Sequence, residues 1–177
     1  MDLTVAITGA TSGIGRAVAE AFVDEGAFVA VSGRDGAAVD RTVAALNGED
    51  DESGGGGDDS SDEGEDGADD TAAERGTAWG DRVDVRDEFD LERFFERVAR
   101  EAGPVDVVFA NAGVFHGAPG ESPTDELSYA DYDDTMRTNA RGVFATITEA
   151  VPHLADDARV VVPSGAVAAE SKPGMGA

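Results

Sequence analysis

The feature that most constrains this chain is a glycine-rich turn, residues 8–15, that joins a short apolar run to an amphipathic segment. Its glycines, Gly9, Gly13 and Gly15, follow the spacing Gly-x3-Gly-x-Gly. Gly9 permits a tight turn off a strand, Gly13 lets the backbone approach a ligand, and Gly15 lets a helix pack closely on a sheet. Because the amides at a helix N-terminus favour anions, the turn predicts a strand–helix unit that can bind a diphosphate.

The rest of the chain alternates apolar runs with amphipathic segments. Apolar runs predict strands over residues 3–7, 28–31, 77–85, 105–110 and 159–162. Helical periodicity predicts helices over residues 14–25, 37–46, 88–102 and 129–150. This order predicts an α/β fold, a doubly wound, Rossmann-like parallel sheet within a single domain over residues 1–177. Asp87 is expected to cap the helix over residues 88–102. The helix residues expected to face inward are Ile14, Ala17, Val18, Ala21 and Phe22 in the first helix, Leu91, Phe94, Phe95, Val98 and Ala102 in the third, and Met136, Val143, Phe144 and Ile147 in the last.

Residues 48–75 interrupt this pattern with a segment built mainly from Gly, Asp, Glu and Ser. It holds thirteen acidic residues and one arginine, and no apolar residue larger than alanine. Such a composition cannot bury enough apolar surface to offset the entropy of ordering. We therefore expect a disordered acidic insert.

The charge balance of the whole chain limits its partners. Thirteen Lys and Arg face 38 Asp and Glu, a net charge of −25, and Lys172 is the sole lysine. This field disfavours nucleic acid and anionic membranes, since phosphate binding needs clustered cations. An acidic surface almost without lysine is typical of halophilic proteins, the alternative being an ordinary acidic protein that carries an acidic segment. With no basic leader and no apolar run of membrane-spanning length, we expect a cytoplasmic protein.

Further motifs follow the glycine turn in a fixed order. Asp84-Val85 follows the third strand, Asn111-Ala112-Gly113 follows the fourth, Asn139 lies within the last helix, and Ser164 follows the fifth strand. With these motifs the sequence resembles the short-chain dehydrogenase/reductase (SDR) family. The resemblance covers the chain except for the acidic insert, and it implies that five of the family's seven strands are present.

The resemblance implies a nicotinamide dinucleotide cofactor and assigns residues to it. In the second strand, Ser32 and Gly33 stand where NAD-preferring relatives place an acid, and Arg34 follows. Because a guanidinium pairs well with a 2′-phosphate, NADP is preferred over NAD, the alternative being that Arg34 is a solvated residue beside Asp35. Asn111 is expected to serve the ribose, the sheet or both. The cofactor-binding residues expected are Gly9, Thr11, Ser12, Gly13, Ile14, Gly15, Arg34, Asp84, Val85, Asn111, Ala112 and Gly113.

The catalytic residues that the resemblance implies are only partly present. Asn139 and Ser164 match the family's asparagine and serine, although counting without gaps would place Gly165 at the serine position. No tyrosine is followed four residues later by lysine, and the sequence ends about one residue before the position where that tyrosine is expected. We expect a C-terminally incomplete oxidoreductase for a small carbonyl or alcohol substrate, inactive alone, or else a nucleotide-binding module completed by a partner chain. A homo-oligomer is expected only of an intact member.

No metal site is expected from the sequence. His116 and His153 have no neighbour at metal-ligand spacing, so both are interpreted as surface or loop residues. The acidic residues between Asp125 and Asp134 are interpreted as the solvated start of a helix, where the helix dipole favours negative charge.

Overall fold

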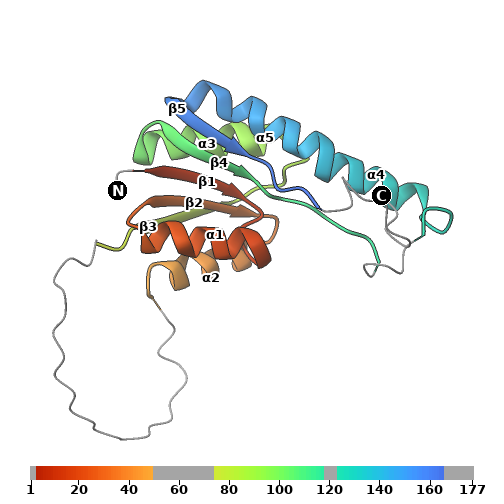
Figure 1. Cartoon of the computed structure of the whole chain (residues 1–177), viewed down its shortest axis with the longest axis horizontal. Helices are drawn as coiled ribbons and strands as arrows, with labels where there is room; N and C mark the ends of the chain where they lie inside the picture. Colours follow the sequence, from red (N-terminus) through yellow and green to blue (C-terminus); the bar gives the residue numbers. More distant parts are fainter. Residues whose placement is uncertain (1–2, 50–73, 118–122, 166–177) are drawn as a thin grey trace, which may run out of the picture.

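A computed structural model describes residues 3–49, 74–117 and 123–165 of the chain. Its centre is a five-stranded parallel sheet in the order β3-β2-β1-β4-β5 (Figure 1). The chain therefore reverses direction along the sheet at β1, as the predicted doubly wound fold requires. The strands are β1 (Thr4–Thr8), β2 (Phe28–Gly33), β3 (Thr77–Arg82), β4 (Val105–Ala110) and β5 (Leu154–Val161).

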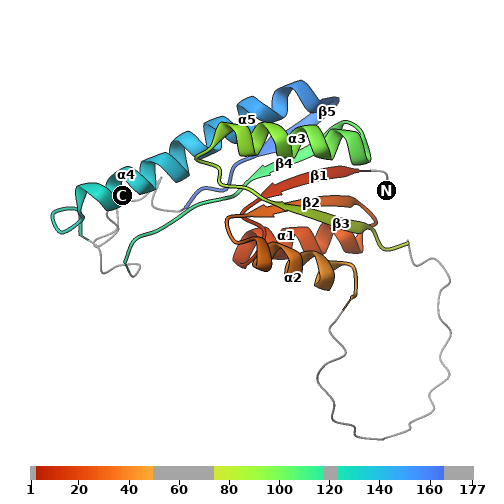
Figure 2. The same ribbon diagram turned by 180° about the vertical axis from the view of Figure 1, so that it is seen from behind.

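Helices cover both faces of this sheet (Figures 1 and 2). Helices α1 (Gly13–Asp24) and α2 (Gly36–Leu46) lie on one face. The opposite face carries α3 (Glu88–Ala102) and a long helix that follows the loop after β4. This long helix comprises α4 (Tyr129–Met136), the π-helical segment η1 (Arg137–Gly142), α5 (Val143–Ala150) and the 3₁₀ turn η2 (Val151–His153).

Two apolar cores, one on each face, result from the alternation of side chains along the strands. Val5 and Ile7 of β1 join the core under α1 and α2, whereas Ala6 joins the core under α3 and α5. The second core is the more aromatic, because Phe94 and Phe95 of α3 are fully buried in it. The predicted inward stripe of α3 is thus confirmed at Leu91, Phe94, Phe95 and Val98.

The predicted inward faces of the first and last helices are partly wrong. Ile14 is 65% exposed and Phe144 is 69% exposed, and Met136 is exposed as well. Small residues face the sheet instead, because these helices approach it closely. The long helix also approaches the loop after β3, since a Cβ on Gly142 would lie 2.7 Å from Val85 Cγ2. The buried positions are Gly15, Ala19 and Val23 in α1 and Thr135, Thr138, Gly142, Ala145, Thr146 and Ala150 in the long helix.

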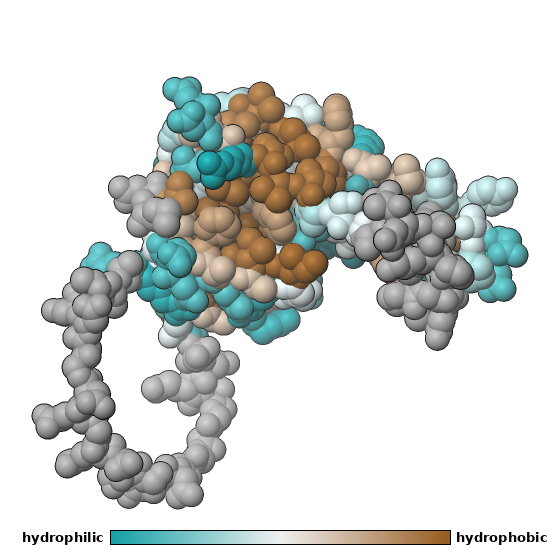
Figure 3. Space-filling view, viewed as in Figure 1, coloured by the Kyte–Doolittle hydropathy of each residue, from teal (hydrophilic) through white to brown (hydrophobic). Residues whose placement is uncertain are grey.

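The strand boundaries also differ from prediction at two places. β3 ends at Arg82, so Asp84 and Val85 belong to the loop that follows it, and β5 begins at Leu154 rather than at Arg159. β5 lies at the edge of the sheet, and Val160, Val161 and Val162 are exposed. Figure 3 shows apolar residues gathered over β5 and the neighbouring strands on the face that carries α1.

The two ends of the acidic insert are held together at the base of the fold. Residues 50–73 lie outside the described residues, so the predicted disorder stays a prediction. At the base, Asn47 Nδ2 donates to Ala78 O (3.0 Å) and Asn47 Oδ1 accepts from Ala78 N (2.7 Å). Arg75 is paired with Asp24 at 3.1 Å. The end of α2 is thereby joined to the start of β3.

Within the described residues, no helix is long and apolar enough to cross a membrane.

A candidate nucleotide-binding site

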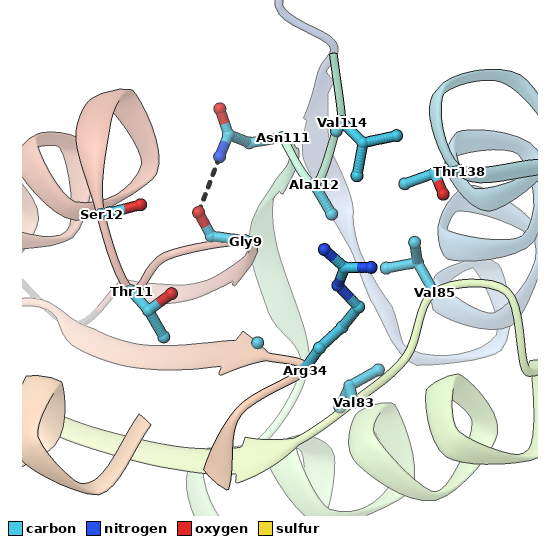
Figure 4. Close-up of a pocket in the computed structure, with 12 residues that line it drawn as sticks. Gly9, Thr11, Ser12, Arg34, Val83, Val85, Asn111, Ala112, Val114 and Thr138 are labelled. Carbon is cyan, nitrogen blue, oxygen red and sulfur yellow. Dashed lines mark hydrogen bonds between the residues drawn. The ribbon is translucent and has the colours of Figure 1, made fainter. Parts of the chain in front are cut away.

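A cavity of about 320 Å³ opens at the carboxyl ends of the strands, beside β1 and β4 (Figure 4). These two neighbouring strands mark the point where the strand order reverses, which is where ligands bind in doubly wound folds. The cavity brings together segments from five parts of the chain. It is lined by Gly9, Thr11, Ser12, Gly33, Arg34, Val83, Val85, Asn111, Ala112, Gly113, Val114 and Thr138.

The glycine turn forms one side of this cavity, and its glycines have separate roles. Gly9 has φ +69°, and a Cβ there would lie 2.7 Å from Ala112 Cα. A Cβ on Gly15 would collide with Gly9 O and lie 2.5 Å from Asn111 Nδ2. Gly13 has φ +56°, yet a Cβ there would meet no heavy atom within 4 Å. Gly9 and Gly15 are therefore required by packing, whereas Gly13 faces open space.

The N-terminus of α1 differs from those of the other helices that begin after a loop. Asp35 caps α2, Asp87 caps α3 and Ser128 caps α4, each through a side-chain oxygen that accepts a backbone N–H. Ser12 occupies the N-cap of α1 and makes no such bond. Because the first amides of a helix have no partner within the helix, the missing cap leaves those of α1 without a side-chain acceptor at the N-cap.

Asn111 braces the turn from the end of β4. Its Nδ2 donates to Gly9 O (2.9 Å) and to Thr8 O (3.3 Å), and Thr8 Oγ1 accepts from the backbone N–H of Asn111 and of Ala112 (both 3.2 Å). These contacts join residues more than 100 positions apart. Of the two roles expected for Asn111, the structure supports bracing of the sheet.

Arg34 is the cationic side chain of the cavity. Its guanidinium points inward from the end of β2 (Figure 4). The neighbouring Asp35 accepts a hydrogen bond from Ala38 N at the start of α2. Among the described residues, no carboxylate lies within ion-pair distance of Arg34, so its charge is available to an anion in the cavity.

An ion-pair network centred on Arg86 lies beside the cavity. Arg86 donates to both carboxylate oxygens of Asp84 (2.6–3.1 Å) and to Asp134 of α4 (2.6 Å). His116 lies 3.1 Å from Asp134 and 3.5 Å from Asp131. His116 lies in the loop after β4, in line with its interpretation as a surface or loop residue, and these carboxylates are contacts that the sequence did not indicate. Asp84 does not line the cavity, whereas the adjacent Val85 does.

The network also shifts the acid–base equilibria of its members. Hydrogen bonds from Arg86 lower the pKa of Asp84 below its usual value. For Asp134, partial desolvation acts to raise the pKa, but hydrogen bonds from Arg86 and His116 outweigh it and the pKa is lowered. The paired carboxylates in turn raise the pKa of Arg86. All three residues therefore carry their charges at neutral pH.

These shifts predict how the stability depends on pH. A carboxylate whose pKa is lowered on folding stabilises the fold above its unfolded pKa and loses that contribution as pH falls through the folded value. We expect Arg86→Met to lower the melting temperature at pH 7 and to lower it progressively less below about pH 4. Thermal unfolding between pH 7 and pH 3 measures this. Arg100→Met is the control, since Arg100 makes no ion pair among the described residues. An equal loss at every pH would contradict the prediction.

The two predicted catalytic residues are placed differently. Asn139 Oδ1 accepts from Val114 N and its Nδ2 donates to Val114 O, both at 2.8 Å. Its side chain thus holds the loop after β4 against η1, and a catalytic role stays a prediction. Ser164 is exposed beyond the end of β5 and is not among the residues that line the cavity. The described residues contain no cluster of three potential metal ligands.

Thr138 carries a buried hydroxyl that has no hydrogen-bond partner among the described residues. The residue is 3% exposed and lies in η1 at the edge of the cavity. By contrast, the other four threonines of the described helices each donate to the carbonyl four residues earlier, at 2.8–2.9 Å; they are Thr42, Thr135, Thr146 and Thr148. An unsatisfied buried hydroxyl costs stability.

Replacement of Thr138 by its isosteric analogue should therefore stabilise the chain. We expect Thr138→Val to raise the free energy of unfolding by about 1 kcal/mol, because it removes an unpaired polar group without changing the volume. Chemical denaturation measures the change. Thr146→Val is the matched control, since it removes a hydroxyl that is bonded to Gly142 O, and it should lower stability. A destabilised Thr138→Val chain would show that the hydroxyl has a partner in solution.

Family models match nearly the whole chain. Residues 57–177 match the model described as enoyl-(acyl carrier protein) reductase, and residues 3–55 match the model described as short chain dehydrogenase. The chain belongs to the short-chain dehydrogenase/reductase family. The boundary between the two matches falls within the acidic segment, so this SDR chain carries its insert between the second helix and the third strand.

Individual relatives agree with the family model. The SDR chain is 32% identical over 152 residues to the oxidoreductase asL5 of Sarocladium schorii, covering 86% of this chain and 48% of that protein. It is 32% identical over 138 residues to D-threitol dehydrogenase of Mycolicibacterium smegmatis, covering 78% and 42%. The chain thus spans about half the length of the curated relatives it matches. An alcohol dehydrogenase from Thermococcus sibiricus complexed with 5-hydroxy-NADP has the same fold, with a TM-score of 0.76 at 24% identity over 98% of this chain and 62% of that one.

The cavity gathers most of the predicted cofactor-binding residues and adds four that were not among them. Gly13, Ile14, Gly15 and Asp84 are the predicted residues outside its lining, although the first three begin α1 directly beside it. The additional lining residues are Gly33, Val83, Val114 and Thr138. Each is adjacent in sequence to a predicted motif residue, so extending every motif by one position would have found them.

Proposed function

We propose that this chain is the nucleotide-binding part of an NADP-dependent SDR oxidoreductase, in which a hydride passes between the cofactor and a small carbonyl or alcohol substrate. The uncapped N-terminus of α1 at the edge of the cavity carries this proposal most directly. Its free amides, the open space at Gly13 and the positive end of the helix dipole suit a diphosphate.

The residues around the cavity divide the work of holding the dinucleotide. The diphosphate would lie on the turn, where Thr11 and Ser12 supply hydroxyls, and Arg34 would pair with a 2′-phosphate. Val83 and Val85 offer an apolar wall for the base. The bound cofactor would supply the hydride chemistry, while these residues bind and orient it.

Titration of the folded chain with NADPH and NADH, followed by cofactor fluorescence and thermal shift, tests the proposal. NADPH should bind more tightly than NADH and raise the melting temperature as its concentration rises. A folded chain that binds neither nucleotide would overturn the assignment.

We further propose that these 177 residues do not turn over substrate by themselves. In SDR enzymes a tyrosine assisted by a lysine four residues later transfers the proton, and no such pair occurs in this sequence. An NADPH oxidation assay with a panel of small aldehydes and ketones should detect binding without turnover. Turnover by the chain alone would contradict this. If turnover appears only when a second polypeptide is added, the chain is a module completed by a partner.

The net charge of −25 leads us to propose that the chain works at high salt. Repulsion among so many carboxylates destabilises a compact state. Salt weakens this repulsion, because the Debye length falls to about 3 Å at 1 M ionic strength. We expect the melting temperature to rise steadily between 0.1 and 2 M KCl. A flat or falling curve in thermal unfolding would instead favour an ordinary acidic protein.

A further inference from the structure

The loop that follows β3 forms a wall of the cavity without being part of the sheet. β3 ends at Arg82, and Val83 and Val85 then present their side chains to the cavity. Both valines are at most 4% exposed. A planar base can pack against this wall only while the loop keeps its shape, so whatever fixes the loop affects the binding of a base.

Arg86 helps to fix this loop, although it does not itself line the cavity. Asp90 of α3 also holds the loop, since its Oδ2 accepts from Asp84 N at 3.1 Å. Within the loop it binds both carboxylate oxygens of Asp84, and its backbone N–H donates to Asp84 Oδ1 at 3.0 Å. Across the fold it reaches Asp134 of α4, 48 residues away, at 2.6 Å. The Arg86 side chain thus stabilises the turn of the loop through Asp84 and links the loop to α4 through Asp134.

Two further contacts make the anchor more specific. Arg141 of η1 donates to Arg86 O (2.9 Å) and to Glu88 (2.6 Å). Gly142 lets the long helix pack closely against Val85, because a Cβ on Gly142 would lie 3.4 Å from Val85 O. The loop is therefore held on both sides of Val85, by its own carboxylate pair and by the long helix.

We propose that Arg86 is a positioning residue for the adenine end of the cofactor and acts through Asp84 and Val85. The inference rests on the proposed function, because it presumes that the cavity holds a dinucleotide. Among the described residues, the hydrogen bonds of Arg86 reach Asp84, α4 and η1 but not the glycine turn, so its removal should weaken binding of the adenosine half of the ligand and leave the nicotinamide half unaffected.

Three ligands separate these effects in the 177-residue chain: NADPH, adenosine 2′,5′-bisphosphate and reduced nicotinamide mononucleotide. For Arg86→Gln we expect Kd to rise about tenfold for NADPH and for adenosine 2′,5′-bisphosphate, because the loop loses roughly one charge-assisted contact. For the mononucleotide we expect Kd to rise by less than about twofold. Arg100→Gln is the charge-matched control. Arg100 is exposed, makes no ion pair among the described residues and does not line the cavity.

A double-mutant cycle tests whether the anchor to α4 matters. We expect Asp134→Asn to weaken binding of adenosine 2′,5′-bisphosphate in the same direction. The double variant with Arg86→Gln should bind adenosine 2′,5′-bisphosphate no more weakly than Arg86→Gln alone does, because both changes remove the same contact between Arg86 and Asp134. If Arg86→Gln does not fold by circular dichroism, Asp134→Asn takes its place in the three-ligand comparison.

The outcomes distinguish the two proposals. If the unmodified chain binds no nucleotide, the proposed function fails. If it binds NADPH but Arg86→Gln binds adenosine 2′,5′-bisphosphate as tightly as the control does, the positioning role is overturned. An equal loss for the adenosine and nicotinamide ligands would also overturn it, because it would indicate a general structural effect.

Discussion

Gly13→Ala is expected to weaken nucleotide binding strongly in a chain that keeps most of its stability, whereas Gly15→Ala is expected to destabilise the fold itself. At Gly13 the φ of +56° costs alanine about 1 kcal/mol, and no heavy atom lies within 4 Å of its Cβ. That Cβ would project into the open space at the uncapped N-terminus of α1. We expect Kd for NADPH to rise on the order of 100-fold, the loss of about one strong charge-assisted contact.

At Gly15 the added Cβ meets atoms that cannot move aside. Its neighbours are the carbonyl oxygen of Gly9, the Asn111 amide that braces that carbonyl, and Ala10 Cα at 3.1 Å. Overpacking against backbone should cost about 3 kcal/mol or more, and the melting temperature should fall by roughly 10 °C. Thermal unfolding and NADPH titration of both variants measure the contrast. If Gly13→Ala retained NADPH affinity, the turn would not be the phosphate site.

Arg34→Gln is expected to remove the preference for NADPH over NADH. Loss of a charge-assisted contact with the 2′-phosphate should raise Kd for NADPH about 10- to 100-fold, while Kd for NADH should change by less than about twofold. Competition titrations with the two nucleotides at constant ionic strength measure the ratio.

The control for this prediction is Arg41→Gln, which removes an exposed positive charge from α2, outside the cavity lining. It separates a local contact from a general change in the field of an acidic protein. If Arg34→Gln weakened both nucleotides equally, Arg34 would bind the diphosphate rather than the 2′-phosphate. If neither changed, it would be a solvated surface residue.

The parts of the fold that follow from local pattern were predictable from sequence. The glycine spacing, the apolar runs and the capping residue Asp87 each depend on neighbours within a few positions, and the structure confirms the sheet, the turn and that cap. The same patterns located most of the cavity, because in a parallel α/β sheet the carboxyl ends of the strands lie at a common edge.

The contacts that depend on how helices approach the sheet were not predictable. Periodicity favours the largest apolar residues as the buried face, but close packing selected small ones, and Phe144 is left exposed. The pairing of Arg86 with Asp134 and of Asn139 with Val114 joins distant segments whose approach no local pattern specifies. The carboxylate neighbours of His116 were not predictable for the same reason, since they come from α4.

The closure at Asn47 and Ala78 has a consequence for how this chain can change. Two hydrogen bonds join the end of a helix to the start of the next strand, so the polypeptide between them is not needed to connect the two elements in space. Lengthening a loop whose ends are already fixed adds little entropic cost, because that cost grows only with the logarithm of length. This junction is therefore a natural entry point for foreign sequence. A reporter domain or an affinity tag grafted there should be carried without disturbing the opposite end of the sheet.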